Sequence, residues 1–284
     1  MSYFKKKSSE EYWEKRLNKD FSLAGVGSFG AGLEYNTWLY KARLYVLKRL
    51  LKEKDIDYQG GSVLDVGVGT GFYINFWEKL GVNNITGIDI TAKSVATLKK
   101  KHPNYQFVKA DISSNVLPLN KKFDIITAFD ILFHIVQEKD FEQAIKNIKA
   151  FSHKDSIILI TDCFVKVYKP MPGYQNYRTL KHYRRVLNKY GMQIEIIKPI
   201  FYFMVSPIDI ERINNPMMSF LIKQLWQTSM KVINHSKKLG KLGKIINYLL
   251  GLGVYCLDRL VLISNHTGPS TKLVLIRVKS NQDD

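Results

Sequence analysis

The chain has 284 residues, of which 45% are hydrophobic and 12% aromatic, enough to bury at least one substantial core. This composition excludes an intrinsically disordered chain and a small disulfide-stapled domain. Lys and Arg number 43 against 25 Asp and Glu, which gives a formal net charge of +18. Such an excess favours a polyanionic partner, namely nucleic acid, an anionic membrane surface or a phosphorylated substrate, although a general drift of the composition toward Lys explains it equally well.

Two cysteines occur, Cys163 and Cys256, far apart and outside any Cys-x-x-Cys or Cys/His cluster. The pattern predicts neither a disulfide framework nor a metal site. The start, Met1–Lys7, is basic, but no apolar run follows it, which argues against a secretory signal. The most apolar stretch, residues 245–263, contains the Asp258–Arg259 pair and two glycines, so it is a poor membrane span. We therefore expect a cytoplasmic protein, soluble or peripherally associated with a membrane.

Residues 1–59 form an N-terminal segment with helical patterns at residues 10–17 and 37–53 and a glycine-rich stretch at residues 25–32. The glycine-rich stretch does not follow a strand, so it supports a flexible lid or hinge better than a phosphate cradle. Tyr12 and Arg16 stand four residues apart on one helix face, where they could hold a cofactor carboxylate together. A solvated surface arginine explains the same spacing equally well.

From residue 62 onward, short β-branched runs alternate with longer helical patterns, which is typical of a parallel sheet with crossover helices. We predict an α/β fold with a doubly wound, mostly parallel seven-stranded sheet, whose core spans residues 60–198. The predicted strands are residues 62–66, 84–89, 105–108, 123–128, 156–161, 192–197 and 272–278.

A mostly helical insert, residues 199–271, precedes the final strand at residues 272–279 and carries much of the positive charge. Between Arg212 and Leu260 there are eight Lys or Arg residues and one acid, and after residue 160 the chain has 19 basic and 7 acidic residues. One helix of the insert is amphipathic. A helical cap over the substrate site is the favoured interpretation. An interfacial surface for anionic lipid, aided by the lysines of residues 237–244, is the second, and RNA binding is the least supported.

The strongest motif is a buried strand that runs into a glycine-rich turn and then a helix, with glycines at Gly67, Gly69 and Gly71. Glycines there let the backbone turn sharply and let a ligand approach the main-chain N–H groups. The spacing differs from the dinucleotide fingerprint Gly-x-Gly-x-x-Gly, because Phe72 occupies the place of the third glycine. Asp65, at the start of the turn, would repel a pyrophosphate and attract a sulfonium. The motif therefore favours S-adenosylmethionine over a dinucleotide, with Asp65 and the three glycines as binding residues.

Two further acids follow the next two predicted strands. Asp89, with Ile90 after it, lies where an adenosine ribose could donate both of its hydroxyls to a carboxylate. Asp111, followed by Ile112, suits the amino group and the face of an adenine. Either acid alone could be a loop residue or a helix cap, but their spacing with the glycine turn predicts a cofactor site.

On these motifs, and on the segment Phe123–Asp130, the sequence from about residue 60 to 199 resembles the class I S-adenosylmethionine-dependent methyltransferases. The resemblance implies that Phe129 lines the methionine end of the cofactor. Other segments resemble a bacterial branch of that family, whose members often act on small molecules or saccharides, which implies a role in cell-surface glycan or natural-product biosynthesis. The resemblance departs from the family at the long insert before the final strand.

Methyl transfer to a hydroxyl is helped by a base that takes the proton. His134 follows the fourth predicted strand, and Asp130 lies four residues earlier, so a helical segment would let Asp130 orient the imidazole. Packing against a neighbouring helix is the alternative role of His134. We expect O-methylation of a small-molecule or saccharide-type acceptor, lipid- or phosphate-linked acceptors included. The alternatives are an RNA methyltransferase and a binding protein of the same fold that does not catalyse.

Overall fold

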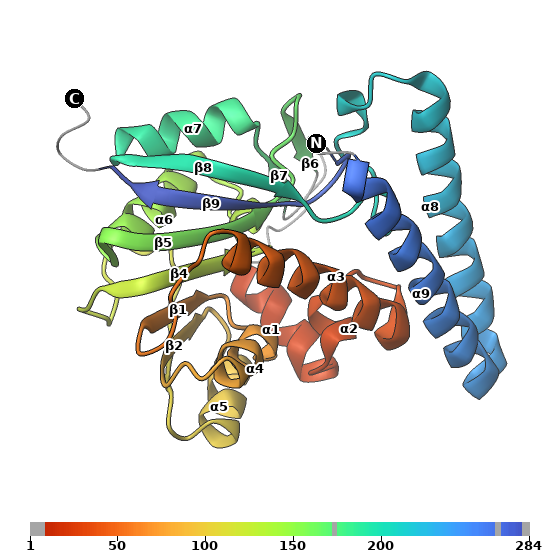
Figure 1. The fold of residues 1–284 in the computed structure, drawn as a ribbon. Coiled ribbons are helices and arrows are strands. Elements are labelled where there is room, and N and C mark those ends of the chain that lie inside the picture. The colour runs from red at the N-terminus through yellow and green to blue at the C-terminus, as the bar shows by residue number, and fades with distance from the viewer. Residues whose placement is uncertain (1–8, 172–174, 265–267, 280–284) are drawn as a thin grey trace, which may run out of the picture.

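The computed structural model describes residues 9–171, 175–264 and 268–279, and the basic start Met1–Lys7 lies outside them. Nine strands and nine α-helices alternate along these residues (Figure 1). The strands are β1 Ser62–Val66, β2 Asn84–Asp89, β3 Gln106–Lys109, β4 Phe123–Phe129, β5 Ser152–Asp162, β6 Lys169–Met171, β7 Gln175–Tyr177, β8 Met192–Pro199 and β9 Lys272–Val278.

Three helices precede the first strand, and the others lie between the strands. They are α1 Ser9–Lys19, α2 Leu23–Val26, α3 Gly32–Glu53, α4 Phe72–Lys79, α5 Ala92–Lys101, α6 Glu138–Ala150, α7 Leu180–Lys189, α8 Pro216–Ser236 and α9 Gly240–Ser264, with 3₁₀ turns η1 Leu132–His134, η2 Ile210–Arg212 and η3 Lys237–Leu239.

Seven strands form one sheet in the order β3-β2-β1-β4-β5-β9-β8, in which β9 runs antiparallel to both of its neighbours. The other pairs, from β3 to β5, are parallel. All seven predicted strands are confirmed, and so is the mostly parallel sheet. The β6–β7 pair was not predicted, because strands of three residues carry too little periodicity to be recognised.

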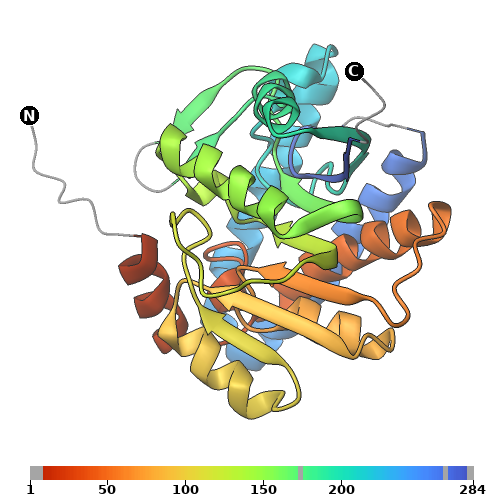
Figure 2. The ribbon, with the colours of Figure 1, turned by 90° about the vertical axis from the view of Figure 1, so that its left-hand side faces the viewer.

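Each face of the sheet is covered by its own set of helices, because alternate residues of a strand point to opposite faces (Figure 2). Val63, Ile125 and Leu159 lie in a core shared with α3, α4 and α5. Leu64 and Ile158 face the other way, into a core shared with α6 and α7. The two cores hold the sheet in the middle layer of a three-layer α/β/α arrangement, which fixes the positions of the strand ends.

The insert is a pair of helices, α8 and α9, joined through η3 and standing beside the sheet domain (Figure 1). Helix α9 packs against α3 at Gly251, where a Cβ atom would lie 2.6 Å from Cδ1 of Trp38. Asp258 is fully buried and accepts hydrogen bonds from the backbone N–H groups of Tyr202 (3.0 Å) and Phe203 (2.6 Å). The acid that interrupts the apolar stretch therefore anchors α9 to the segment after β8.

By length and composition, the stretch Pro216–Ile263 is apolar enough for a membrane-spanning helix, and 22% of its most apolar window is buried. In the fold this stretch is two helices rather than one, with one side of α9 packed on α3.

Candidate active site

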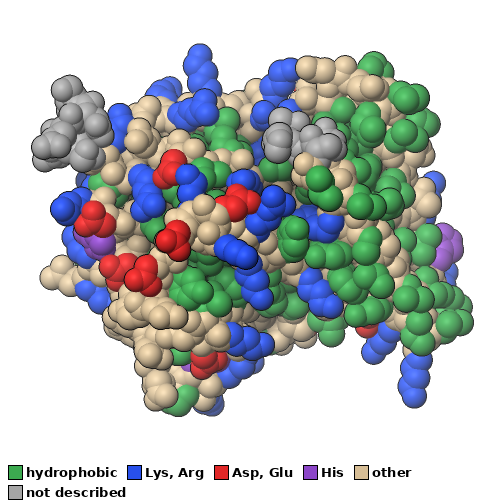
Figure 3. All heavy atoms as spheres, in the orientation of Figure 1, with side chains coloured by type: hydrophobic (Ala, Val, Ile, Leu, Met, Phe, Trp, Pro, Cys, Tyr) green, Lys and Arg blue, Asp and Glu red, His purple; other side chains and the backbone are tan. Residues whose placement is uncertain are grey.

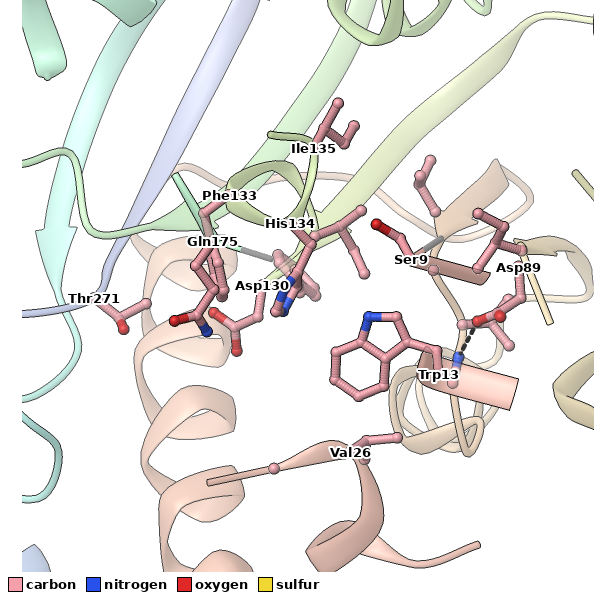
Figure 4. A pocket seen from close by; sticks show the side chains of 18 of the residues that line it. Ser9, Trp13, Val26, Asp89, Asp130, Phe133, His134, Ile135, Gln175 and Thr271 are labelled. Atoms are coloured by element: carbon pink, nitrogen blue, oxygen red, sulfur yellow. Dashed lines mark hydrogen bonds between the residues drawn. The ribbon is translucent and has the colours of Figure 1, made fainter. Parts of the chain in front are cut away.

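A cavity of about 670 Å³ opens at the carboxyl ends of β1, β2 and β4. Helix α1 and the segment after it form a second wall. The segment after β8 and the residues just before β9 form a third wall. Figure 4 shows Asp89 on one side of this cavity and Asp130, Gln175 and Thr271 on the other, with Trp13 and His134 between them. A cavity of this size takes a nucleoside-sized ligand together with a small second molecule.

The glycine turn has the backbone conformation that its sequence predicts. Gly67 (φ +75°) and Gly69 (φ +51°) both lie in the left-handed region and line the cavity. A Cβ atom on Gly67 would lie 2.1 Å from Cδ1 of Ile131, so a larger residue there would displace that side chain and strain the backbone. Gly71 (φ +78°) is not among the described lining residues; a Cβ atom there would lie 2.5 Å from Leu98, so this glycine serves helix packing instead of the direct ligand contact expected of it.

Asp89 closes β2 and lines the cavity together with Ile90. Its Oδ2 accepts a hydrogen bond from the N–H of Gly69 (2.9 Å), and its Oδ1 accepts from the N–H (2.8 Å) and the hydroxyl (2.7 Å) of Thr91. Burial raises the pKa of this carboxyl, and the hydrogen bonds from Thr91 and Gly69 oppose that shift. Since a carboxylate has about four acceptor positions, Asp89 as it stands keeps one for a ribose hydroxyl instead of the two that we expected.

Asp111 and Ile112 line the cavity beyond Asp89, as predicted. Oδ1 of Asp111 accepts hydrogen bonds from the N–H (2.8 Å) and the hydroxyl (2.7 Å) of Ser113, which fixes the carboxylate at the wall. The buried Ile112 offers an apolar surface beside it. An acid next to an apolar side chain can bind both the amino edge and the face of a purine.

Asp65 lies beneath the glycine turn and is not among the described residues that line the cavity. Its Oδ1 accepts a hydrogen bond from the hydroxyl of Thr127 (2.6 Å), and its Oδ2 is buried without a hydrogen-bond partner. Burial raises the pKa of Asp65 to about 7, the Thr127 hydroxyl opposes that shift, and the charge of Asp89 adds to it. The predicted direct contact of Asp65 with a cofactor is therefore not supported, and its charge can act only through the turn above it.

Tyr12 and Arg16 share one face of α1, as their spacing predicts, and Nη1 of Arg16 donates to the Tyr12 hydroxyl (3.2 Å). Nη2 of Arg16 donates to the carbonyl of Gly27 (2.8 Å) and so ties α1 to the glycine-rich stretch. Arg16 lines the cavity, whereas Tyr12 is not among its described lining residues. A second tie comes from Asn36, whose Oδ1 accepts from the N–H of Ser28 (2.8 Å). The stretch thereby forms a wall of the site, the place expected of a lid.

Asp130 and His134 both line the cavity, but the helix predicted to align them is absent from residues 130–134. Asp130 has φ +60°, a left-handed conformation that aspartate tolerates, and only Leu132–His134 form a 3₁₀ turn. Oδ2 of Asp130 pairs with Nη2 of Arg43 (2.7 Å), and its Oδ1 accepts from the hydroxyl of Thr161 (2.9 Å). Asp130 is thus engaged by β5 and α3, and the helical condition under which Asp130 was expected to orient His134 is not met.

Aromatic rings surround His134. Its imidazole lies edge-on to Trp13 at 5.1 Å between ring centroids and tilted against Phe133 at 4.3 Å. Trp13 comes from α1, so the N-terminal helix helps to position this histidine. Phe129 lines the cavity as the resemblance implied, with Tyr73 packed on it at 4.4 Å between centroids.

Sequence reasoning missed Arg43, which lines the cavity from the middle of α3. Its Nη2 meets Asp130, while its Nε and Nη1 are buried without a hydrogen-bond partner. Its guanidinium also lies 4.9 Å from the ring centroid of Tyr40 and 5.0 Å from that of Phe201. No local pattern marks this residue, because an arginine inside a long amphipathic helix usually faces water.

The far half of the cavity was also missed. Its walls include Gln175, Tyr177, Ser206 and Thr271, which come from β7 and from the two ends of the insert. No described residue of α8 or α9 lines the cavity, so these helices do not form the substrate cap that we favoured from the sequence. Cys163 also lies there, and burial raises the pKa of its thiol, so the group stays protonated and is a poor nucleophile.

The residues present fit S-adenosylmethionine. A glycine turn that excludes side chains lies beside an acid at the end of β2, a second acid with an apolar neighbour lies beyond it, and a buried carboxylate oxygen without a partner lies beneath the turn. The backbone N–H groups at the turn and Asp89 would hold the ribose and methionine parts, and Asp111 with Ile112 would hold the adenine.

Comparison with known families supports this fit. Residues 63–155, from β1 to the start of β5, match the family model described as "Methyltransferase domain". By this match, the segment from β1 to the start of β5 is similar to methyltransferase domains.

Curated relatives align with the same half of the chain. The ribosomal protein L11 methyltransferase of Thermosipho africanus is 27% identical over 161 residues, which are 55% of this chain and 54% of that protein. The enzyme of that name from Aquifex aeolicus is 31% identical over 142 residues, 49% of this chain and 52% of that protein. The ubiquinone/menaquinone biosynthesis C-methyltransferase of Campylobacter jejuni is 28% identical over 142 residues, 48% of this chain and 54% of that protein. The chain spans about half the length of these relatives.

Solved structures extend the similarity of fold beyond that segment. A complex of DhpI with SAM and HEP superposes with a TM-score of 0.51 at 16% identity, covering 67% of this chain and 90% of that one. A second DhpI complex, with SAH, gives a TM-score of 0.50 at 18% identity, covering 68% and 90%. At such low identity these matches support the fold.

Proposed function

We propose that this chain, an S-adenosylmethionine-dependent methyltransferase of the class I fold, O-methylates a small acceptor of the saccharide type. The observation that carries the proposal is the single cavity that runs from Asp89 and Asp111 to His134 and Gln175. One end has the groups that suit a nucleoside, and the other has a candidate base among aromatic and amide side chains.

The walls of the acceptor half indicate the kind of acceptor, whereas the names of the relatives differ, with a ribosomal protein in one case and quinone biosynthesis in another. Its lining combines the rings of Trp13 and Tyr177 with the amide of Gln175 and the hydroxyls of Ser206 and Thr271. Rings pack against the C–H faces of a sugar, while amides and hydroxyls exchange hydrogen bonds with its hydroxyl groups. This mixture suits a polyhydroxylated acceptor better than a flat, wholly apolar one.

The bound cofactor supplies a methyl group on a sulfonium, and transfer is an in-line displacement by the acceptor oxygen. The protein's part is to hold that oxygen in line and to take its proton. A neutral imidazole at His134 can accept the proton, and the rings of Trp13 and Phe133 restrict its orientation. Asp130 carries a negative charge in the same cavity and would stabilise the imidazolium, moderated by its pairing with Arg43.

The test is to incubate the full chain with S-adenosylmethionine labelled in the methyl group and an extract of host cells. The products are then separated into polysaccharide, lipid-linked saccharide, free small-molecule, protein and RNA fractions. The proposal predicts base-stable label on a saccharide or small-molecule fraction, released as an O-methyl sugar on acid hydrolysis. A parallel reaction without the protein controls for activity from the extract itself.

Label confined to RNA, and sensitive to ribonuclease, would replace the proposal with the RNA methyltransferase alternative. Binding of S-adenosylmethionine without label in any fraction would favour a methyltransferase-fold binding protein.

A further inference from the structure

The α8–α9 hairpin, residues 216–264, exposes a continuous apolar stripe. On α9, apolar residues that are exposed on the surface recur at spacings of three, four or seven, namely Leu242, Ile245, Leu249, Cys256, Leu260 and Ile263. The side chain of Leu249 is 57% exposed and that of Ile263 68%. The opposite side of the same helix is buried at Gly251, Val254 and Asp258. The protein therefore covers one side of α9 and leaves an apolar side exposed.

The start of α8 continues this surface. Met217, Phe220 and Leu221 are exposed there, beside the end of α9, since the two helices are antiparallel and packed together. Figure 3 shows apolar side chains gathered over the region of α8 and α9. Patches of this kind on a soluble protein mark an interaction surface.

Positive charge accompanies the stripe at the turn of the hairpin. Lys237, Lys238, Lys241 and Lys244 cluster where α8 passes into α9, and all four are exposed. The one acid of the hairpin, Asp258, is fully buried and bonded to backbone N–H groups. The exposed surface of the hairpin thus combines apolar side chains with lysines and presents no carboxylate.

This combination identifies the chemistry of the partner. A second copy of the same surface would offer no acid to the lysines in any orientation, because Asp258 is buried in each copy. An anionic bilayer meets both requirements, since its phosphates pair with the lysines at headgroup depth while the apolar stripe enters the boundary of the acyl chains.

The cavity described above opens beside this surface. Phe29 lines the cavity and is 84% exposed, so it lies at the rim. Nζ of Lys237 lies 3.9 Å from the position that a Cβ atom on the neighbouring Gly30 would take. The turn of the hairpin and the rim of the cavity are therefore adjacent.

We propose that the α8–α9 hairpin docks the protein on an anionic lipid bilayer, with the apolar stripe of α9 inserted at the interface and the lysines of residues 237–244 on the lipid phosphates. Docking is peripheral, because the other side of α9 is packed on α3. It places the rim at Phe29 next to the membrane surface, within reach of an acceptor carried on a lipid.

The test is flotation of the full chain with vesicles of phosphatidylcholine alone and of phosphatidylcholine mixed with phosphatidylglycerol, at low and high salt. The proposal predicts flotation with the anionic vesicles and much weaker flotation with the neutral ones. Reversing three charges, in Lys238→Glu/Lys241→Glu/Lys244→Glu, should lower partitioning onto anionic vesicles on the order of a hundredfold. The matched control reverses three exposed lysines of α5, in Lys99→Glu/Lys100→Glu/Lys101→Glu, and should float far better.

A second pair of variants tests the apolar stripe. Ile245→Glu/Leu249→Glu should lose flotation, whereas Val116→Glu/Val167→Glu, which changes two exposed valines elsewhere by the same charge, should keep it. Circular dichroism and thermal unfolding verify that each variant is folded.

Three results would overturn the proposal. The wild type could fail to float with anionic vesicles at low salt, or Ile245→Glu/Leu249→Glu could float as the wild type does. Alternatively, sedimentation could show a dimer that this same double change dissociates, which would assign the stripe to a second copy of the chain.

Discussion

Arg43 and Asp130 form an ion pair, with 2.7 Å between Nη2 and Oδ2, that joins the middle of α3 to the carboxyl end of β4 at the wall of the cavity. The side chain of Arg43 is 11% exposed, and two of its nitrogens lack a hydrogen-bond partner. A buried guanidinium of this kind depends strongly on its one carboxylate. The pair thus couples the N-terminal segment to the sheet at the place where the acceptor half of the cavity begins.

Asp130→Ala should lower the free energy of unfolding by about 3 kcal/mol, because it leaves the charge of Arg43 buried without its partner. Chemical denaturation measures this change. The double variant Arg43→Met/Asp130→Ala should recover a large part of the loss, since it removes both charges. Asp155→Ala, at an exposed aspartate, is the control and should be nearly neutral. A single variant as stable as the wild type would show that the pair contributes nothing to the fold.

Asp65 should make cofactor binding depend on pH. Its pKa is raised to about 7, chiefly by burial, so the carboxylate becomes ionised as the pH rises through neutrality. An ionised carboxylate beneath the turn favours a sulfonium, and so the ratio of the affinities for S-adenosylmethionine and S-adenosylhomocysteine should rise several-fold across that range. Calorimetric titrations of both ligands measure the ratio.

In Asp65→Asn the same ratio should be constant with pH. A ratio that changes equally in wild type and variant would assign the dependence to another group.

His134→Ala should lower the turnover number by about a hundredfold to ten-thousandfold, the usual range for a lost general base, and leave the affinity for S-adenosylmethionine unchanged. The measurements are steady-state rates on the identified acceptor and a calorimetric titration of the cofactor. His235→Ala, at an exposed histidine of α8, is the matched control. Full activity of His134→Ala would show that His134 is not the base and that it packs against Trp13 instead.

Asp258 should make stability depend on pH. Burial raises its pKa from 3.8 to about 6, so the fold favours the protonated acid more than the unfolded chain does. The contribution of the protonated Asp258 to the free energy of unfolding is fully present below pH 3.8. It is lost as the pH rises through about 6. Relative to Asp258→Asn, the wild type should therefore lose about 3 kcal/mol over that interval. Denaturation curves across the interval test this, and parallel curves for the two proteins would refute the role of Asp258.

The large sheet and the acids at its edge could be predicted from the sequence, because short sequence patterns determine them. Each strand of the large sheet is a short β-branched run, and Asp89 and Asp111 follow such runs directly, so the topology of a parallel sheet brings both to one edge. Gly67 and Gly69 lie where a turn needs a left-handed backbone. These features depend on residues that are close in the sequence, so sequence patterns predict them.

Features that depend on distant contacts were missed or misjudged. The buried Arg43 depends on a carboxylate 87 positions later in the chain, and the turn at Asp130 is fixed by its backbone N–H, which donates to the hydroxyl of Thr161 (2.8 Å). Gly71 was expected to meet a ligand and instead lies against Leu98 of the next helix. Whether α8 and α9 cover the cavity or stand beside it depends on how α9 packs on α3 and α8 on α9, which composition does not specify.

Calorimetric titration of S-adenosylmethionine into wild type and Asp89→Ala tests whether the cofactor binds at the carboxyl end of β2. We predict one-to-one binding by the wild type and an affinity lower by about tenfold to a hundredfold in the variant, because each hydrogen bond to a charged group contributes about 1.5–3 kcal/mol. Asp155→Ala should bind as the wild type does. Absence of binding by the wild type, or equal affinity in Asp89→Ala, would contradict the account.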